Sequence, residues 1–372
     1  MASIDKRLNG KWRARYREVP GGPQKTRSFD RKLDAVAFLD VVRGDLARGT
    51  YVDPGAGRTF RRFAEPWLAS QTFDPSTHEA VALRLRVHLL PTLGDMDLRA
   101  IRPSTVQAWV RGRQQQLAPT YVRVLLANLS AILGAATDDG LIASNPCRAR
   151  SVKAPALERE RVEPWPQERV AAVVAAHPMA YRAMPVAAAG AGLRQGEVFG
   201  LRVEDVDFLG RRLRIRQQVK LLDGKPVTAP PKGGKTREVP LADVVAVALA
   251  ERLRQHPAGS AGLVFTSREG KPMNRNYYNT RVWKPALRKA GVEPLRTNGM
   301  HALRHYYASV LLDAGENVRA LADYLGHADP GFTLRVYTHL MPASEDRARR
   351  AVEEALGPRA EDWLRTAEPA GG

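Results

Sequence analysis

The segment His301-Ala302-Leu303-Arg304-His305 combines two imidazoles and a guanidinium within a predicted helix over 301–314. Two histidines four residues apart can bind zinc on a helix, but Arg304 would repel a cation and no glutamate accompanies the pair. An arginine with neighbouring histidines instead provides hydrogen-bond donors that suit an anion. We therefore interpret this segment as part of an anion-binding site and expect no metal.

Three further segments carry chemically related groups. Gly192-Leu193-Arg194-Gln195-Gly196-Glu197 follows an Ala/Gly-rich segment, residues 231–241 read PKGGKTREVPL, and Leu325-Gly326-His327 precedes Tyr337. A second arginine can bind non-bridging phosphate oxygens, a lysine on a β-turn can release a proton, and a tyrosine supplies an oxygen nucleophile. Together these groups predict phosphoryl transfer at a cationic centre that needs no metal.

The order of these groups along the chain resembles that of the tyrosine recombinase family, and of phage-type integrases in particular. The resemblance covers nearly the whole chain and is strongest over residues 165–341. It implies a catalytic set in which the last residue is the nucleophile: Arg194, Lys232, His301, Arg304, His327 and Tyr337.

Neighbouring residues are interpreted with less direct roles. Glu197 is expected to support the arginines without taking part in the chemistry, and His305 to pack within its own helix. Lys235 is an alternative to Lys232, because both lie in the same turn-forming segment and only the motif match favours Lys232.

The resemblance also implies the reaction, which is site-specific DNA recombination. Tyr337 would attack the scissile phosphate and form a 3′-phosphotyrosine, while the arginines and His327 hold the non-bridging oxygens. Lys232 would protonate the leaving 5′-oxygen, and His301 is a candidate acid or base. One phosphodiester is exchanged for another, so we expect no ATP and no cofactor. The expected function is integration and excision of a phage or mobile element at attachment sites.

The amino-acid composition indicates which class of protein this is and which class of partner it binds. The 372 residues are 44% hydrophobic and 26% charged, which is typical of a soluble globular protein. Lys and Arg exceed Asp and Glu by 58 to 39, and the net charge of +19 favours a polyanionic partner such as nucleic acid. The single cysteine, Cys147, excludes an intrachain disulfide. We see no segment apolar enough to span a membrane and no signal peptide, so we expect a cytoplasmic protein, associated with the nucleoid when on DNA.

The N-terminal residues predict a small DNA-binding unit. Basic side chains alternate with Trp12, Ala14 and Tyr16, so one face of a strand would be cationic and the other would pack. The candidate DNA contacts on that face are Lys11, Arg13, Arg15 and Arg17. Residues 1–57 resemble the arm-site DNA-binding domain of phage integrases, a sheet with a helix.

The remaining chain predicts two larger domains within a mainly α fold that has small β-sheets (α+β). Residues 58–150 resemble a helical core-binding domain, 151–164 form a linker, and 165–372 form a mixed α/β catalytic domain with a C-terminal helix and tail. Within the last domain, residues 213–219 read as one strand that pairs with segments near 227 and 239–241. The C-terminal helix, near 343–356, could dock on a neighbouring protomer or on its own domain.

The implied partners are nucleic acid and further copies of the chain. We expect double-stranded DNA at core and arm-type attachment sites, bound by a homotetramer. The resemblance also implies a DNA-bending host factor and an excision factor as further partners. No membrane partner is expected.

Three alternatives share part of this evidence. The tripeptide Gly234-Lys235-Thr236 matches the end of a nucleotide-binding loop motif. However, Ala229 stands where the motif requires its first glycine, and Pro230 and Pro231 lie within the segment that would form the loop. A non-catalytic DNA-binding regulator would need only the basic helices and arm. A type IB topoisomerase would use the same chemistry without specific sites, and the arm-like unit argues against it.

Overall fold

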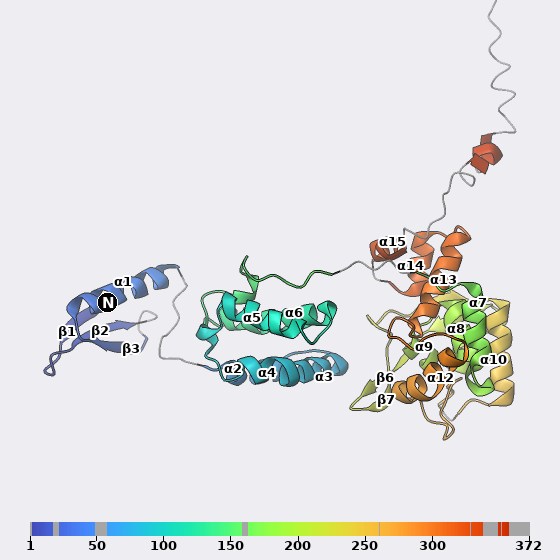
Figure 1. Cartoon of the computed structure of the whole chain (residues 1–372), viewed down its shortest axis with the longest axis horizontal. Coiled ribbons are helices and arrows are strands. Elements are labelled where there is room, and N and C mark those ends of the chain that lie inside the picture. Colours follow the sequence, from blue (N-terminus) through green and yellow to red (C-terminus); the bar gives the residue numbers. More distant parts are fainter. Residues whose placement is uncertain are drawn as a thin grey trace, which may run out of the picture. The chain divides into compact units, whose positions relative to one another are not determined.

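A computed structural model describes residues 2–17, 22–48, 58–157, 163–259, 261–327, 329–337, 349–350 and 352–356. The chain divides into two compact units, residues 1–159 and 160–372 (Figure 1). The boundary between the units falls inside the segment that the sequence predicts to be a linker, 151–164.

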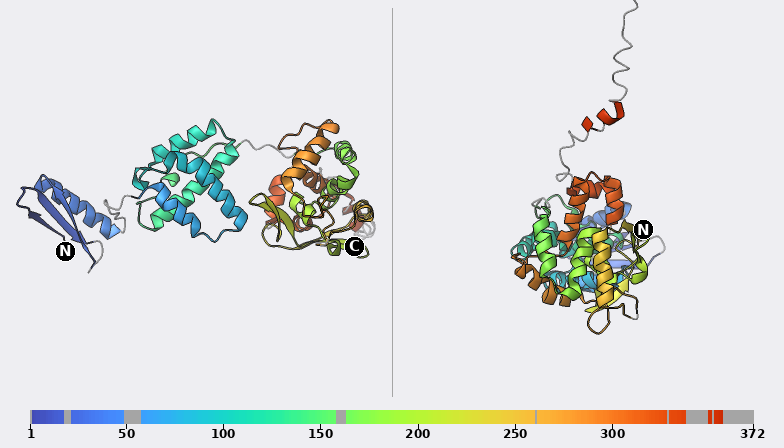
Figure 2. Two further views of the ribbon diagram at one scale, coloured as in Figure 1. Left: turned by 90° about the horizontal axis from the view of Figure 1, so that it is seen from below. Right: turned by 90° about the vertical axis from the view of Figure 1, so that its right-hand side faces the viewer.

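The first unit begins with a three-stranded antiparallel sheet in the order β1 (Ser3–Lys6), β2 (Trp12–Arg17) and β3 (Gln24–Phe29). Helix α1 (Lys32–Arg48) covers one face of this sheet (Figure 2). Ala14 and Tyr16 are buried against Leu39 and Val42 of the helix. The intervening Arg13 and Arg15 point away from this core, because successive side chains of a strand alternate between its faces.

Residues 58–157 of the first unit are helical. The elements are α2 (Phe60–Ala69), α3 (Pro75–Arg84), the π-helix η1 (Leu85–Leu89), α4 (Leu90–Leu93), η2 (Leu98–Ala100), α5 (Pro103–Gln114), α6 (Pro119–Asp138) and η3 (Pro146–Arg148). Part of the predicted linker packs on these helices. The Arg123 guanidinium donates to the Pro155 carbonyl over 2.8 Å, and the Lys153 amide donates to Gln107 Oε1 over 2.7 Å.

Helix α6 corrects one expectation drawn from the sequence. By length and composition alone this helix could cross a membrane, although we expected no such segment. Its apolar residues have another role, because Leu125, Leu129 and Ile132 are fully buried in the core of the helical part. A core helix of a globular domain and a membrane span share the same apolar composition.

The second unit is a helical bundle with small sheets on its flank (Figures 1 and 2). Its helices are α7 (Gln167–Ala176), α8 (Met179–Ala191), α9 (Gln195–Gly200), η4 (Val203–Asp205), α10 (Asp243–Gln255), α11 (Arg275–Tyr278), η5 (Asn279–Trp283), α12 (Lys284–Lys289), α13 (His301–Asp313), α14 (Val318–Leu325) and α15 (Pro330–Tyr337). Helix α8 is central and packs against α7, α10 and α13, and its small residues Ala187, Ala188 and Ala191 are fully buried. These elements confirm the predicted α+β class.

The described strands of the second unit form two separate sheets. Strands β4 (Val206–Asp207), β5 (Arg212–Ile215) and β8 (Arg237–Pro240) form one antiparallel sheet, and β6 (Gln218–Leu222) pairs with β7 (Lys225–Ala229) in a second, two-stranded sheet. The single strand expected over 213–219 is therefore wrong. It breaks at Arg216, whose side chain turns to Asp205 over 2.5 Å and to Glu204 over 2.9 Å.

Helix α9 sits directly on β6. A side-chain carbon at Gly196 would lie 2.8 Å from the Val219 carbonyl oxygen, so only glycine allows this approach. The contact holds the start of α9, and with it Arg194, beside the β6–β7 hairpin.

Candidate active site

Arg304 lies at the centre of the site and is fixed by backbone oxygens from two distant segments. Its guanidinium donates to the carbonyl of Gly192, over 2.7 Å, and to that of Leu325. The side chain is only 1% exposed. Burial, and then the nearby charge of Arg194, lower the pKa of Arg304 to about 9. The guanidinium therefore stays charged at neutral pH and adds a buried positive charge.

Glu197 holds the second arginine in place. Arg194 caps the start of α9, where its amide lies 2.9 Å from Glu197 Oε2 and its Nη1 lies 2.8 Å from Oε1. Burial would raise the pKa of Glu197, but the hydrogen bonds and charge of Arg237, with Arg194, lower that pKa to about 2. The carboxylate is thus ionised throughout the physiological range and lies between two guanidiniums.

Arg237 is a third arginine in this cluster, which the sequence analysis missed. It donates to both Glu197 oxygens over 2.9 and 2.7 Å, and its Nε donates to the Tyr324 carbonyl over 2.7 Å. Strand β8, which carries Arg237, is thereby tied both to α9 and to the end of α14. The signal was present in the sequence, since Arg237 lies within the 231–241 segment whose lysine was singled out.

His327 follows α14 and faces Arg304. Its Nε2 lies 3.1 Å from Arg304 Nη2, and its Nδ1 lies 2.8 Å from Thr333 Oγ1. Because a guanidinium can only donate, Nε2 is the acceptor and we assign the ring proton to Nδ1. Burial, and then the charge of Arg304, lower the pKa of His327 to about 4, so the ring is neutral at pH 7.

Tyr337, at the end of α15, is 2% exposed and contacts a histidine. Its hydroxyl lies 2.6 Å from Nδ1 of His305. The His305 ring packs edge-on against the His301 ring, with 4.6 Å between the ring centroids. Burial raises the pKa of Tyr337 to about 12, and the charge of Arg304 opposes this shift. Burial and positive neighbours lower the pKa of His305 to about 4. The expectation that His305 only packs within its helix was therefore wrong.

His301 and the candidate lysines lie at the open side of the site. His301 is exposed at the first position of α13 and lines a cavity of about 480 Å³ together with Arg194. Lys232 is exposed at the corner of a β-turn in which the Gly234 amide donates to the Pro231 carbonyl over 2.8 Å. Gly233, the third residue of this turn, has a φ of 84°, which glycine adopts readily.

The structure brings some of the predicted residues together and leaves others apart. Arg194 Nη2 lies 3.4 Å from the Gly326 carbonyl, next to His327, and His327 contacts Arg304. Glu197 contacts Arg194, and the Tyr337 hydroxyl contacts His305, which follows Arg304 on α13. Neither Lys232 nor Lys235 makes a side-chain hydrogen bond or ion pair within the described part of the chain. No cluster that could bind a metal occurs among the described residues.

The predicted basic face of β2 is partly engaged within the sheet. Arg13 and Arg15 both contact Asp5, over 2.8 and 2.9 Å, and their hydrogen bonds lower the pKa of Asp5 to about 2. Lys11 lies 3.3 Å from Asp30, and Arg17 donates to the Gly22 carbonyl. These contacts order the side chains on one face.

Comparison with known proteins agrees with this arrangement. Residues 167–344 match the model of the phage integrase family, and residues 60–152 match the phage integrase central domain. The putative prophage phiRv2 integrase of Mycobacterium tuberculosis is 30% identical over 343 residues, which cover 89% of each chain. These matches define a class of enzymes that recombine DNA at specific sites. The chain belongs to the phage integrase family of tyrosine recombinases, as the sequence predicts.

Solved structures share the fold at lower identity. The Tn1549 transposon integrase, in complex with a circular intermediate DNA, has a TM-score of 0.69 and 20% identity, over 80% of this chain and 99% of that chain. A lambda integrase tetramer bound to a Holliday junction has a TM-score of 0.59 and 17% identity, over 90% of this chain and 94% of that chain. The predictions of family, fold class and recombinase activity are confirmed.

Proposed function

We propose that this site-specific recombinase cleaves DNA through Tyr337, inside a pocket walled by Arg194, Arg304 and His327. The observation that carries the proposal is the convergence of these three groups, with the Tyr337 hydroxyl hydrogen-bonded to His305, the residue that follows Arg304 on α13. The Arg194 and Arg304 guanidiniums are held in place before the reaction, and such charges stabilise the added negative charge of a phosphoryl-transfer transition state. The neutral His327 ring orients Arg304 by accepting its hydrogen bond. Glu197 supports this wall by fixing Arg194.

The proposed step balances as a transesterification. The Tyr337 oxygen forms a bond to phosphorus, the bond from phosphorus to the 5′-oxygen breaks, and a 3′-phosphotyrosine and a 5′-hydroxyl result. Lys232 gives a proton to the leaving 5′-oxygen. His305 Nδ1, which lies 2.6 Å from the phenol oxygen, accepts the phenol proton. His301 contacts the phosphate from the open side. Attack by another 5′-hydroxyl reverses the step, so no cofactor is consumed.

We propose the following division of labour along the chain. Residues 1–57 bind arm-type sites through Lys11, Arg13, Arg15 and Arg17, 58–150 bind the core site, 151–164 link, and 165–372 carry the chemistry. The net charge of +19 supports double-stranded DNA as the partner. The lambda integrase tetramer on a Holliday junction suggests a homotetramer here too. A nucleoid-associated location, a DNA-bending host factor and an excision factor rest on the family alone.

The test is a pair of matched tyrosine variants on a core-site duplex. Tyr337→Phe is expected to bind DNA but to form no covalent adduct, because the nucleophilic oxygen is gone. Tyr306→Phe, on the neighbouring α13, should keep both activities. An adduct formed by Tyr337→Phe would contradict the proposal. Relaxation of a plasmid that lacks any attachment site would favour a topoisomerase instead.

A further inference from the structure

The catalytic unit contains a cavity that extends beyond the catalytic residues. It has a volume of about 480 Å³ and shares Arg194 and His301 with the site described above. Its other walls come from β6, from the α11–η5–α12 segment and from the loop before α13. Any group bound in this cavity would therefore be a direct neighbour of the scissile phosphate.

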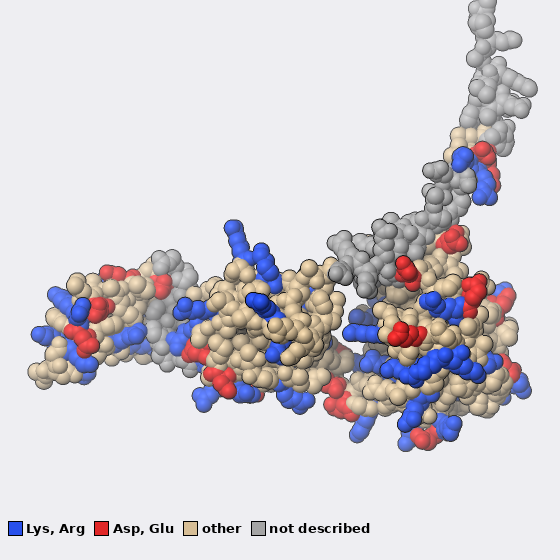
Figure 3. Space-filling view, in the orientation of Figure 1, with Lys and Arg blue, Asp and Glu red and all other residues tan. Residues whose placement is uncertain are grey.

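The Lys and Arg side chains that line the cavity give it a positive charge. Lys220, Arg275, Lys284 and Arg296 line it in addition to Arg194, and none of the described lining residues is acidic. Three of these, Arg275, Lys284 and Arg296, are exposed and make no side-chain hydrogen bond or ion pair with any residue that the structure describes. Figure 3 shows Lys and Arg gathered over the face of this unit that carries α12 and the β6–β7 hairpin.

Other arginines of this unit behave differently. Arg212 and Arg214 on β5 contact Glu238 over 3.0 and 3.3 Å, and Arg216 contacts Asp205 and Glu204. Unpaired cations that converge from separate elements repel one another in the unbound protein. That cost is offset when a polyanion occupies the space between them.

The floor of the cavity is apolar. Trp283, Leu287 and Met300 form part of it, and the indole nitrogen of Trp283 already donates to the Asn298 carbonyl over 3.0 Å. The amide of Gln195 is likewise used, since it donates to Asn279 over 2.7 Å. An apolar floor below a cationic rim suits a deoxyribose with its phosphates, and it offers few groups that could read a base edge.

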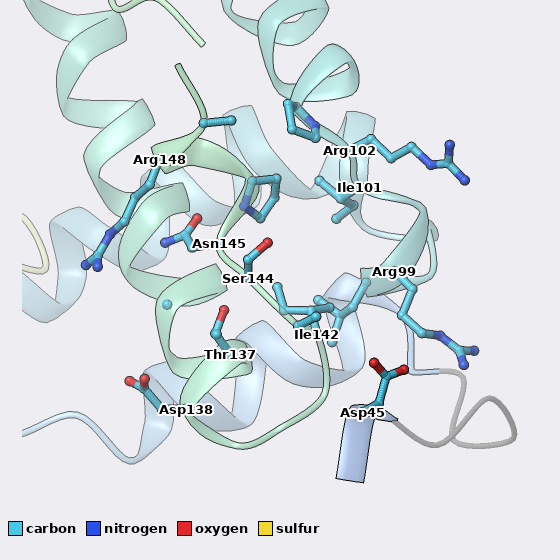
Figure 4. A pocket seen from close by; sticks show the side chains of 16 residues that line it. Asp45, Arg99, Ile101, Arg102, Thr137, Asp138, Ile142, Ser144, Asn145 and Arg148 are labelled. Atoms are coloured by element: carbon cyan, nitrogen blue, oxygen red, sulfur yellow. The ribbon is translucent and has the colours of Figure 1, made fainter. Parts of the chain in front are cut away.

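Another cavity, larger in volume, lacks these properties. It has a volume of about 810 Å³ and lies in the helical part of the first unit, between η2, α5, the end of α6 and η3. Figure 4 shows the side chains of Arg99, Arg102 and Arg148 extending away from its centre. Arg99 contacts Asp97 over 3.0 Å, and the carboxylate of Asp138 is part of the lining. This cavity carries no comparable anion site.

We propose that Lys220, Arg275, Lys284 and Arg296 form a flanking-phosphate site, which binds the DNA phosphates next to the scissile one on the cleaved strand. The inference rests on the proposed function, because Arg194 joins the two sites. Phosphates follow one another at about 3.4 Å of helix axis along a strand, so a strand held at Arg194 must present its next phosphate within the neighbouring space. The site recognises the backbone and not the base sequence.

The test uses the full chain and a core-site duplex over a series of salt concentrations. Arg275→Ala/Lys284→Ala is compared with Arg281→Ala/Arg288→Ala, which removes two cations from the same η5–α12 region outside the cavity. Loss of two phosphate contacts should reduce the slope of log K against log salt by about 2, at about 0.9 per contact. The control pair should keep the wild-type slope. Equal slopes for both double variants and the wild type would overturn the site.

Neutral methylphosphonate linkages then locate the contact. Wild-type protein should lose affinity when a phosphate adjacent to the scissile one is neutralised, and Arg275→Ala/Lys284→Ala should be insensitive to that replacement. Full additivity of the two losses would refute the proposed contact. The thermal unfolding midpoint of each variant should not fall below that of the wild type, because the replaced residues are exposed and make no hydrogen bond or ion pair with the described residues. Adduct formation by the wild-type protein on the same duplex tests the proposed function separately from the flanking-phosphate site. If the adduct forms but neutral flanking linkages do not change the affinity, only the flanking-phosphate site is refuted.

Discussion

At the scale of single residues, the account depends on how buried charges are compensated. Arg194, Glu197 and Arg237 form a chain of alternating charge in which Glu197 is almost completely buried. Removing one partner of a buried ion pair leaves the other charge without compensation. Arg237 therefore acts as a positioning residue, since it holds Glu197 and, through the Tyr324 carbonyl, the approach to His327.

Arg237→Ala is expected to destabilise the catalytic unit by about 3–5 kcal/mol and to lower cleavage, because Glu197 loses its bidentate partner. Chemical denaturation measures the first effect and adduct formation the second. The control is Arg212→Ala, which removes an exposed contact with Glu238 in the same sheet and should cost about 0–1 kcal/mol. A similar cost for the two variants would contradict the positioning role.

Acid should destabilise the catalytic unit through its histidines. The pKa values of His305 and His327 are both lowered to about 4, so the unfolded chain binds more protons than the folded one between pH 6.5 and about 4. Stability should be complete above pH 6.5 and fall as the pH drops toward 4. Urea midpoints at pH 7 and pH 5 measure this loss, and His327→Gln should reduce it. The control variant His256→Gln, at the exposed end of α10, should show the same loss as the wild type. A wild-type urea midpoint that does not change between pH 7 and pH 5 would contradict the prediction.

At the scale of elements, the turn between β7 and β8 exposes both of its lysines, Lys232 and Lys235, to solvent. The turn is anchored at its C-terminal end, because Arg237 of β8 is fixed to Glu197 and Tyr324. Lys232 lies five residues before that anchor, at the corner of the turn. The role proposed for Lys232 therefore requires this turn to bring its ammonium to the leaving 5′-oxygen when DNA is bound.

The role of Lys232 can be tested with a 5′-bridging sulfur at the scissile phosphate. A thiolate leaves without prior protonation, since thiol pKa values lie near 8.5 and far below those of alcohols. Lys232→Ala should therefore cleave the natural duplex poorly and the sulfur-containing duplex at a rate close to that of the wild type. Lys235→Ala should cleave both normally. If the sulfur rescues Lys235→Ala instead, the assignment of the two lysines must be exchanged.

The sequence predicts the elements and the grouping of the motifs better than it predicts their cross-connections. The strand at 12–17, the helix that begins at His301 and the α+β class all follow from local patterns. The contacts of Arg237 with Glu197 and of His305 with Tyr337 span 40 and 32 residues, and no local pattern encodes them. The burial of α6 is equally non-local, because its composition fits a membrane as well as a core.

At the scale of the whole molecule, the excess of positive charge determines how strongly DNA binding depends on salt. A net charge of +19 predicts binding that weakens steeply with salt, because each phosphate contact releases counterions. The proposed division between arm-type and core sites requires the cations to be distributed over both units. A flat salt response would contradict this view.

The arm-site proposal predicts separable effects of substitutions in β2. Arg15→Ala or Arg17→Ala should weaken binding to arm-type DNA, while cleavage of an isolated core site persists, because β2 belongs to a sheet outside the catalytic unit. Gel-shift titrations with each DNA and an adduct assay on the core site measure the two effects. The control is Arg254→Ala, on the exposed face of α10, which should change neither. Equal loss of core-site cleavage would contradict the domain assignment.

The most direct measurement of the central claim is to identify the amino acid that becomes joined to DNA. Wild-type protein is incubated with a nicked core-site duplex that releases its short 5′-fragment, so the covalent complex accumulates. The complex is then digested and the nucleotide-bearing peptide is sequenced by mass spectrometry. We predict a 3′-phosphate linked to Tyr337. A linkage to any other residue, or no linkage although the protein binds the duplex, would contradict the account.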